Sequence, residues 1–202
     1  MLADSEGRVR CQNYTLAWTL LTGGRFLMQC MTWLLPKYIA RRLGMSTLFA
    51  LFLAINPVLI AAFIWLLPVD ENRGHLRWII IGASIQVVAM GLPLPGLPTD
   101  MTAIIFMIVI SSVGEALAWP RVEAYLMSMG RDYEIPHLRS AMALPGALLT
   151  FCGVVASGML LDNYCPSEAS CSPWLWAWVF GISMTTPLGL GVVGLLCHKL
   201  PR

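Results

Sequence analysis

Long apolar segments alternate with short polar segments along the chain. The apolar segments cover residues 14–36, 47–68, 76–94, 101–128, 140–161 and 174–197. Each has about the 20 residues that an α-helix needs to cross a bilayer. The polar segments between them contain glycine, proline or charged residues, which are typical of turns. Because strands with unpaired edges cannot lie in lipid, the pattern predicts an all-α polytopic membrane protein with six transmembrane helices.

The composition also favours lipid as the solvent. Of the 202 residues, 57% are hydrophobic and 12% are charged, whereas soluble domains have roughly 25% charged residues. The net charge of +2 and the lack of a basic block argue against a nucleic-acid partner. We expect residues 1–12 to form a polar leader without the apolar core of a cleavable signal peptide. Residues 13–198 would then form one transmembrane domain in the bilayer.

The basic residues in the polar segments predict the orientation in the membrane. With the leader on the first side, eight of them fall on that side: Arg8, Arg10, Arg73, Arg77, Arg131, Arg139, Lys199 and Arg202. Three fall on the other side: Lys37, Arg41 and Arg42. This excess predicts a multi-pass protein with both termini in the cytosol.

Two cysteines, Cys165 and Cys171, lie in the polar segment 162–173, on the predicted non-cytosolic side. An oxidising compartment would let them form a disulfide, and the alternative is a pair of free thiols. The other cysteines lack the spacing of metal ligands, and the three histidines are scattered. We therefore predict no metal and no cofactor. With no nucleophile motif or phosphate-binding loop either, we do not expect an enzyme.

Three charged residues follow an uncharged run in the fourth span. Glu115 lies near the middle of residues 101–128, and Glu123 follows two turns later on the same stripe. A charge in hydrocarbon is costly, and low dielectric favours the neutral form of a carboxyl group. Glu115 is thus a candidate proton carrier. The alternative is a structural ion pair with Arg25, which lies midway along the first span.

The other polar residues of the spans also have two interpretations. Arg121 is too far around the helix to neutralise Glu115 or Glu123, and Pro120 leaves the carbonyl of Ala116 without its backbone donor. Near the cytosolic end, Arg121 and Glu123 would either gate a cavity or reach water along the helix. Asn56, beside Pro57, would either line the cavity or bond carbonyls that the proline frees.

Several residues have a structural interpretation only. Trp174, Trp176 and Trp178 predict an interfacial aromatic belt at the start of the last span. Small residues in the last two spans predict close helix packing: Gly153, Ser157, Gly158, Gly181, Gly189, Gly191 and Gly194.

The stretch SVGEALAWPRVEAYL, residues 112–126, resembles the tenth helix of a group of major facilitator superfamily transporters. These transporters are akin to the proton-dependent oligopeptide transporters. The matching residues are Ser112, Gly114, Glu115, Ala116, Pro120, Arg121 and Tyr125. Four further stretches are similar in the same order: LPKY at 35–38, INP at 55–57, MALP at 142–145 and SGMLLDNYCP at 157–166. The resemblance runs from about residue 30 to the end.

The resemblance implies the C-terminal six-helix half of a major facilitator fold. Such a protein moves a small solute by alternating access, here with protons as the expected coupling ion. Glu115 would bind a proton or a cationic group of the solute. The same pathway would include Arg25, Gln29, Asn56 and Tyr125, with Arg121 and Glu123 as a cytosolic gate.

Transporters of this kind have twelve helices, and the solute binds between their two halves. Six helices provide one wall of such a site. The expected partner is a second six-helix half, either a copy of this chain or a separate chain, unless the chain is a fragment of a full transporter. The alternative function is a non-transporting structural or assembly subunit of a membrane complex, derived from a transporter half.

Overall fold

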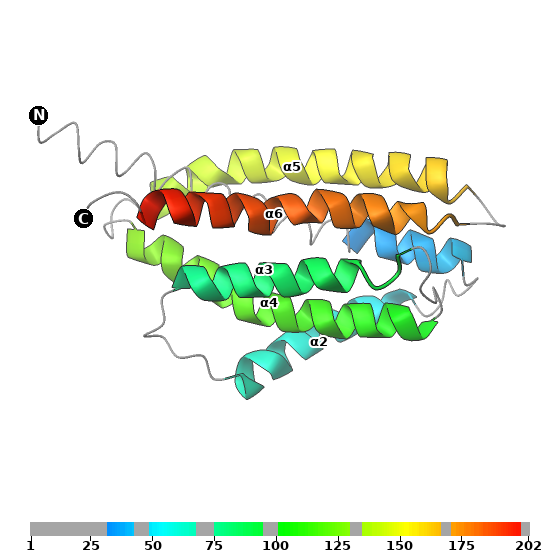
Figure 1. Cartoon of the computed structure of the whole chain (residues 1–202), viewed down its shortest axis with the longest axis horizontal. Helices are drawn as coiled ribbons and strands as arrows, with labels where there is room; N and C mark the ends of the chain where they lie inside the picture. The colour runs from blue at the N-terminus through cyan, green and yellow to red at the C-terminus, as the bar shows by residue number, and fades with distance from the viewer. Residues whose placement is uncertain are drawn as a thin grey trace, which may run out of the picture.

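The computed structural model describes residues 32–42, 49–67, 75–94, 101–129, 135–166 and 171–198. These residues form one helical segment over 32–42 and five longer helices. The five are α2 (Phe49–Leu66), α3 (His75–Met90), α4 (Met101–Met129), α5 (Ile135–Tyr164) and α6 (Trp174–His198). No strand occurs within the described ranges, which confirms the all-α prediction (Figure 1).

Helices α2 to α6 coincide closely with the last five predicted spans, although α5 is longer at both ends. Residues 14–31 of the first predicted span lie outside the described residues. The segment 32–42 corrects the predicted end of that span, because the helix continues past residue 36 to Arg42. Leu34, Leu35, Tyr38 and Ile39 are buried at helical spacing, and this apolar face keeps the next turn helical although it carries charges.

Three of the described helical stretches are long and apolar enough to cross a membrane: Met101–Tyr125, Gly146–Tyr164 and Trp174–Val192. Two shorter apolar helices are Ala54–Leu66 and His75–Met90. Large apolar side chains are exposed on several helices, among them Trp65, Val58, Phe151, Met159 and Leu188. Together with the length and apolar composition of these helices, the exposure of so many large apolar side chains is typical of a membrane protein.

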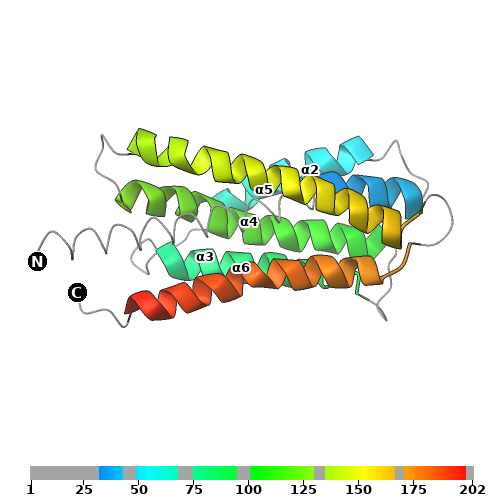
Figure 2. The ribbon, with the colours of Figure 1, turned by 90° about the horizontal axis from the view of Figure 1, so that it is seen from above.

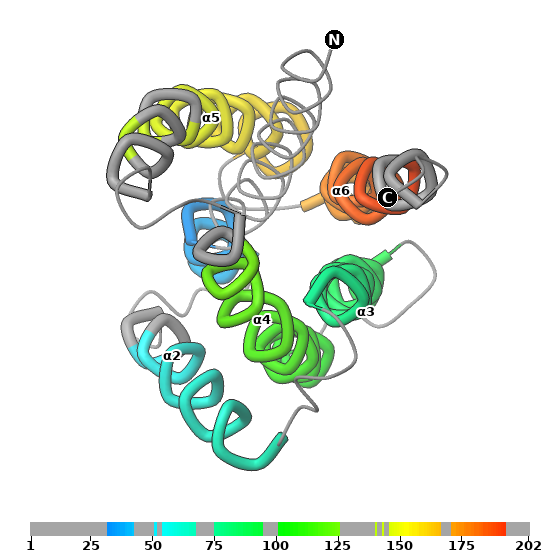
Figure 3. The backbone as a smooth tube through the Cα atoms, turned by 90° about the vertical axis from the view of Figure 1, so that its left-hand side faces the viewer, coloured from blue at the N-terminus to red at the C-terminus, as the bar shows by residue number. Residues whose placement is uncertain are grey.

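The helices lie roughly side by side and alternate in direction (Figures 1 and 2). The segment 32–42, α3 and α5 end at the end of the bundle where α2, α4 and α6 begin. We call this the disulfide end, after Cys165 and Cys171. Seen along the bundle, α4 lies between α2 and α3 and packs against both, and α6 packs against α3 (Figure 3).

The backbones of α3 and α4 touch at two glycines. A Cβ atom added to Gly82 would lie 2.5 Å from the carbonyl oxygen of Gly114. A Cβ atom added to Gly114 would lie 2.6 Å from the carbonyl oxygen of Gly82. Only glycine lets two helices approach this closely. By contrast, a Cβ atom at Gly158, Gly181 or Gly191 would meet no described atom within 4 Å, so these three glycines make no close helix contact within the described part of the chain.

An apolar core joins the segment 32–42 to α3, α4, α5 and α6 near the disulfide end. Tyr38 and Trp176 meet edge to face in this core, with ring centroids 5.1 Å apart. Trp176 is therefore 1% exposed, whereas Trp174 and Trp178 are 61% and 53% exposed. The belt stays a prediction for the two outer tryptophans, which are exposed as it requires. Trp176 instead packs in the core, because residues two apart lie on different faces of a helix.

The contact between Gly82 and Gly114 predicts that a larger side chain at either position destabilises the fold. We expect Gly114→Ala to lower the free energy of unfolding by roughly 1–3 kcal/mol, because the new methyl group meets backbone that cannot rotate away. Reversible denaturation in detergent micelles, followed by circular dichroism, measures this. Gly181→Ala is the matched control and should be neutral or slightly stabilising. Equal effects of the two substitutions would contradict the observed packing.

Candidate functional site

Glu115 is the central residue of the 29-residue helix α4. Its side chain is buried, with 7% of its surface exposed, and its neighbours Ala116 and Leu117 are buried as well. Gly114, which contacts α3, directly precedes it. The close approach of the two backbones therefore fixes the position of α4 at the residue directly before Glu115.

Asn56 of α2 lies between two polar side chains of α4. The hydroxyl Oγ of Ser112 lies 2.6 Å from Oδ1 of Asn56, and the Asn56 amide is within hydrogen-bonding reach of the Glu115 carboxyl group. Ser112 and Glu115 are three residues apart, so they share one face of α4. The structure thus brings Asn56 and Glu115 together through side-chain contacts between α2 and α4.

Sequence reasoning did not assign Ser112 a role. Ser112 belongs to the stretch 112–126 that resembles the transporter helix, and it lies on the same helix face as Glu115. These two facts could have identified it. Its Oγ is also 2.7 Å from the carbonyl oxygen of Ile108, one turn earlier. A serine that bonds back to its own helix is common, and for that reason the sequence alone does not indicate a contact to α2.

Arg121 bonds to its own helix. Its Nη1 donates to the carbonyl oxygens of Leu117 and Ala116, at 3.3 and 3.5 Å. The carbonyl of Ala116 is the one that Pro120 leaves without a backbone donor. The guanidinium group therefore replaces part of the hydrogen bonding that the proline removes, and this was not predicted.

The remaining pathway candidates lie elsewhere. Glu123 and Tyr125 are half-buried in the turns of α4 after Arg121, towards the end of the bundle opposite the disulfide end. Arg25 and Gln29 lie outside the described residues, so the alternative ion pair of Arg25 with Glu115 stays a prediction. Among the described residues, no three His, Cys, Asp or Glu side chains are placed to hold a metal ion.

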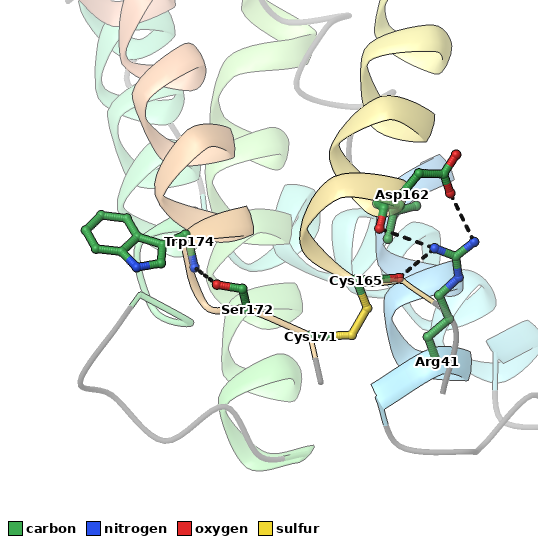
Figure 4. Close-up of a disulfide and its surroundings, with 7 residues drawn as sticks. Arg41, Asp162, Cys165, Cys171, Ser172 and Trp174 are labelled. Atoms are coloured by element: carbon green, nitrogen blue, oxygen red, sulfur yellow. Dashed lines mark hydrogen bonds and ion pairs between the residues drawn. A yellow bond between two sulfur atoms is a disulfide. The ribbon is translucent and has the colours of Figure 1, made fainter. Parts of the chain in front are cut away.

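Cys165 and Cys171 form a disulfide that joins the end of α5 to the segment before α6 (Figure 4). Their Cα atoms are 4.0 Å apart. In the same loop the backbone N–H of Ser172 donates to the carbonyl oxygen of Tyr164 at 2.7 Å. Of the two alternatives left open by the sequence, the structure has the disulfide.

Arg41 binds the last turn of α5 beside this disulfide (Figure 4). Its Nη1 donates to the carbonyl oxygens of Cys165 at 2.7 Å and Leu161 at 3.3 Å. Its Nη2 lies 3.4 Å from Oδ1 of Asp162. The last carbonyls of a helix lack donors within the helix, and the helix dipole favours a cation there. Arg41 therefore caps α5 and fixes it to the segment 32–42.

No protein-family model, curated protein or solved structure matches the chain. The relationship to the major facilitator superfamily accordingly stays a prediction from the motifs in the sequence.

The contacts of Arg121 predict a coupling with Pro120. We expect Arg121→Met to lower the free energy of unfolding by about 1 kcal/mol, because the Ala116 carbonyl loses its donor. In a Pro120→Ala background the new backbone N–H bonds to that carbonyl, so the cost of Arg121→Met should fall to about half. Denaturation of the four proteins of this double-mutant cycle measures the coupling. Additive effects would show that Arg121 does not serve this carbonyl.

The cap on α5 predicts a difference between two adjacent arginines. We expect Arg41→Gln to lower the free energy of unfolding by about 1 kcal/mol, a value reduced by the partial exposure of its ion pair. Arg42 is exposed on the neighbouring face, so Arg42→Gln is the matched control with little expected effect. Denaturation under non-reducing conditions keeps the disulfide intact during the comparison. A larger effect at Arg42 would contradict the assignment.

Proposed function

We propose that this chain is one half of a major facilitator secondary transporter that moves a small solute by alternating access. Glu115 is the group that binds a proton or a cationic part of the solute. The observation that carries the proposal is a buried carboxyl group at the centre of the apolar helix α4, one turn from Ser112, whose hydroxyl contacts Asn56 of α2. Ionisable residues within membrane helices are costly and mark pathways for substrates and protons more often than they stabilise.

The packing around α4 supports a role as one wall of a site. Its contact with α3 is close and rigid at Gly82 and Gly114, whereas its contact with α2 includes hydrogen-bonding side chains. The hydrogen-bonding side chains between α4 and α2 can exchange partners. The glycine backbones between α4 and α3 cannot. The second wall belongs to another six-helix half, either a second copy of this chain or a separate chain, and both lie in the bilayer.

The disulfide supports the proposed orientation of the chain in the membrane. The disulfide end would face an oxidising compartment, because cytosolic thiols are kept reduced. The opposite end, with Arg121 and Glu123, would then face the cytosol along with both termini. Arg121 and Glu123 would gate the solute at that end, where both side chains are half-buried.

A second candidate function is a structural subunit of a membrane complex that transports nothing. The observation that favours it is the closure of the polar contacts around Glu115, which is 7% exposed and has Asn56 as a partner. A satisfied, buried carboxyl group can hold two helices together without ever binding a solute. The two candidates differ in whether that group must change its charge.

Flux measurements separate the two candidates. We reconstitute the chain in vesicles, alone and together with a candidate first half. We then follow proton entry with a pH-sensitive dye while a mixture of dipeptides is added. A transporter half should give solute-dependent proton flux that Glu115→Gln lowers at least about tenfold, or about 1.4 kcal/mol. Asp162→Asn is the control, because Asp162 is a strongly exposed acid at the disulfide end.

The structural candidate predicts the opposite result. The chain would fold and insert, Glu115→Gln would leave its stability nearly unchanged, and no pairing would give solute-dependent flux. This result would overturn the transport proposal.

A further inference from the structure

The hydroxyl group of Ser112 lies within hydrogen-bonding distance of two acceptors. Its Oγ is 2.6 Å from Oδ1 of Asn56 and 2.7 Å from the carbonyl oxygen of Ile108. A serine hydroxyl has one proton to donate and two lone pairs that accept. The hydroxyl can therefore donate to only one of these two oxygens at a time. When it donates to the Ile108 carbonyl, its lone pairs can accept a hydrogen bond from the Asn56 side chain.

The Asn56 side chain connects this hydroxyl to Glu115. One end of its amide faces Ser112 and the other is within reach of the carboxyl group. An ionised carboxylate only accepts hydrogen bonds, so it needs the NH₂ group of Asn56. Oδ1 of Asn56 then faces Ser112 and takes the proton of its hydroxyl. The structure has the second of these contacts, with Oγ of Ser112 2.6 Å from Oδ1 of Asn56.

Protonation of Glu115 reverses every bond in this chain of contacts. The carboxyl group now has an O–H that can donate, so it needs Oδ1 of Asn56. Rotation of the amide by half a turn supplies that oxygen and directs the NH₂ group at Ser112. The Ser112 hydroxyl accepts from it and donates its own proton to the carbonyl of Ile108. The Ser112 hydroxyl, the Asn56 carbonyl oxygen and the facing carboxyl oxygen each have a partner in both states, which avoids the cost of an unpaired polar group at these atoms.

We infer that Ser112 is a positioning residue that couples the protonation of Glu115 to the orientation of the Asn56 amide. The Ile108 carbonyl is the second acceptor that makes the reversal complete. This inference rests on the proposed function in one respect, namely that Glu115 takes up and releases a proton. A proton bound on α4 is thereby transmitted to a side chain of α2.

Few other charged groups surround this network in the described part of the chain. Helix α2 has no ionisable side chain, and α3 has only His75 and Arg77, in its first turn. His75 is seven residues before Gly82, or roughly 10 Å along the helix. On α4 itself, Arg121 and Glu123 lie about two turns from Glu115. Arg25 lies outside the described residues. Glu115 is therefore the titrating group nearest to Asn56 among these helices.

Infrared difference spectroscopy tests the inference on the full chain in lipid vesicles. Spectra are recorded between alkaline and acidic buffer, with the asparagine side-chain carbonyl isotopically labelled. We expect a protonated-carboxyl band that Glu115→Gln removes. A shift of the labelled amide band should accompany it and should disappear in Asn56→Leu. The shift reports a change of hydrogen-bond partner, which a purely structural role would not produce.

Three serine variants test whether the amide shift depends on the hydroxyl group of Ser112. Ser112→Ala should retain the carboxyl band of Glu115 and lose the amide shift. Ser112→Thr keeps a hydroxyl group and should restore the shift. Ser111→Ala is the matched control, because Ser111 is also buried on α4 but lies about 100° around the helix, and it should leave both bands unchanged.

The outcomes distinguish this inference from the proposed function. An amide shift that persists in Ser112→Ala, or a carboxyl band without any amide shift, overturns the inference and leaves the proton role of Glu115 standing. A chain without a carboxyl band that depends on Glu115 overturns both the inference and the proton role of Glu115, and solute flux then tests the cation-binding role on its own. Loss of the shift in Ser112→Ala with rescue in Ser112→Thr supports the inference whether or not solute flux is found.

Discussion

The backbone contact between α3 and α4 at Gly82 and Gly114 determines where the only described carboxyl group at the centre of a helix lies. The two backbones meet directly, so neither helix can slide or rotate without a clash. The residue after Gly114 is therefore held at one height and on one face. Every polar contact proposed for Glu115 depends on this constraint, because hydrogen bonds fail when their atoms move by a fraction of an ångström.

Two arginines compensate for backbone groups that helices leave without donors. Arg121 serves the carbonyl freed by Pro120 within α4, and Arg41 serves the final carbonyls of α5 from a different segment. Within a membrane span an unpaired carbonyl such as that of Ala116 has no water to bond, so it needs a donor from the protein. Arginine suits both, since its charge is permanent and its several N–H groups reach more than one oxygen. These two charges therefore have a structural use that is independent of any transported solute. A gating role for Arg121 would have to break or share the bonds that it makes here.

The sequence predicted the helices and the central position of Glu115, because a run of apolar residues and a count of residues suffice for both. It did not predict the partner of Ser112, since the contact depends on which residue of α2 faces α4. That register comes from side-chain packing over the whole interface. The glycines have the same limit. Gly82 and Gly114 form the close contact, whereas Gly158, Gly181 and Gly191 look alike in the sequence but have no described atom within 4 Å of the Cβ position. Trp176 was misassigned because its two neighbours in the belt do face outward, and only the position of Tyr38 reveals the difference.

The choice between a transporter half and a structural subunit turns on the chemical identity of residue 115. A glutamine would fill the same space and bond to Asn56 in a single arrangement, with no charge to bury. Well-packed apolar residues often replace buried charged groups without loss of stability. A glutamate at this position is therefore a poor choice for holding α2 and α4 together, since it stabilises the contact no better and costs more whenever it ionises. It becomes a good choice if the group must alternate between two charge states. The network of Ser112, Asn56 and the Ile108 carbonyl can satisfy both of those states, which a fixed structural contact would not require.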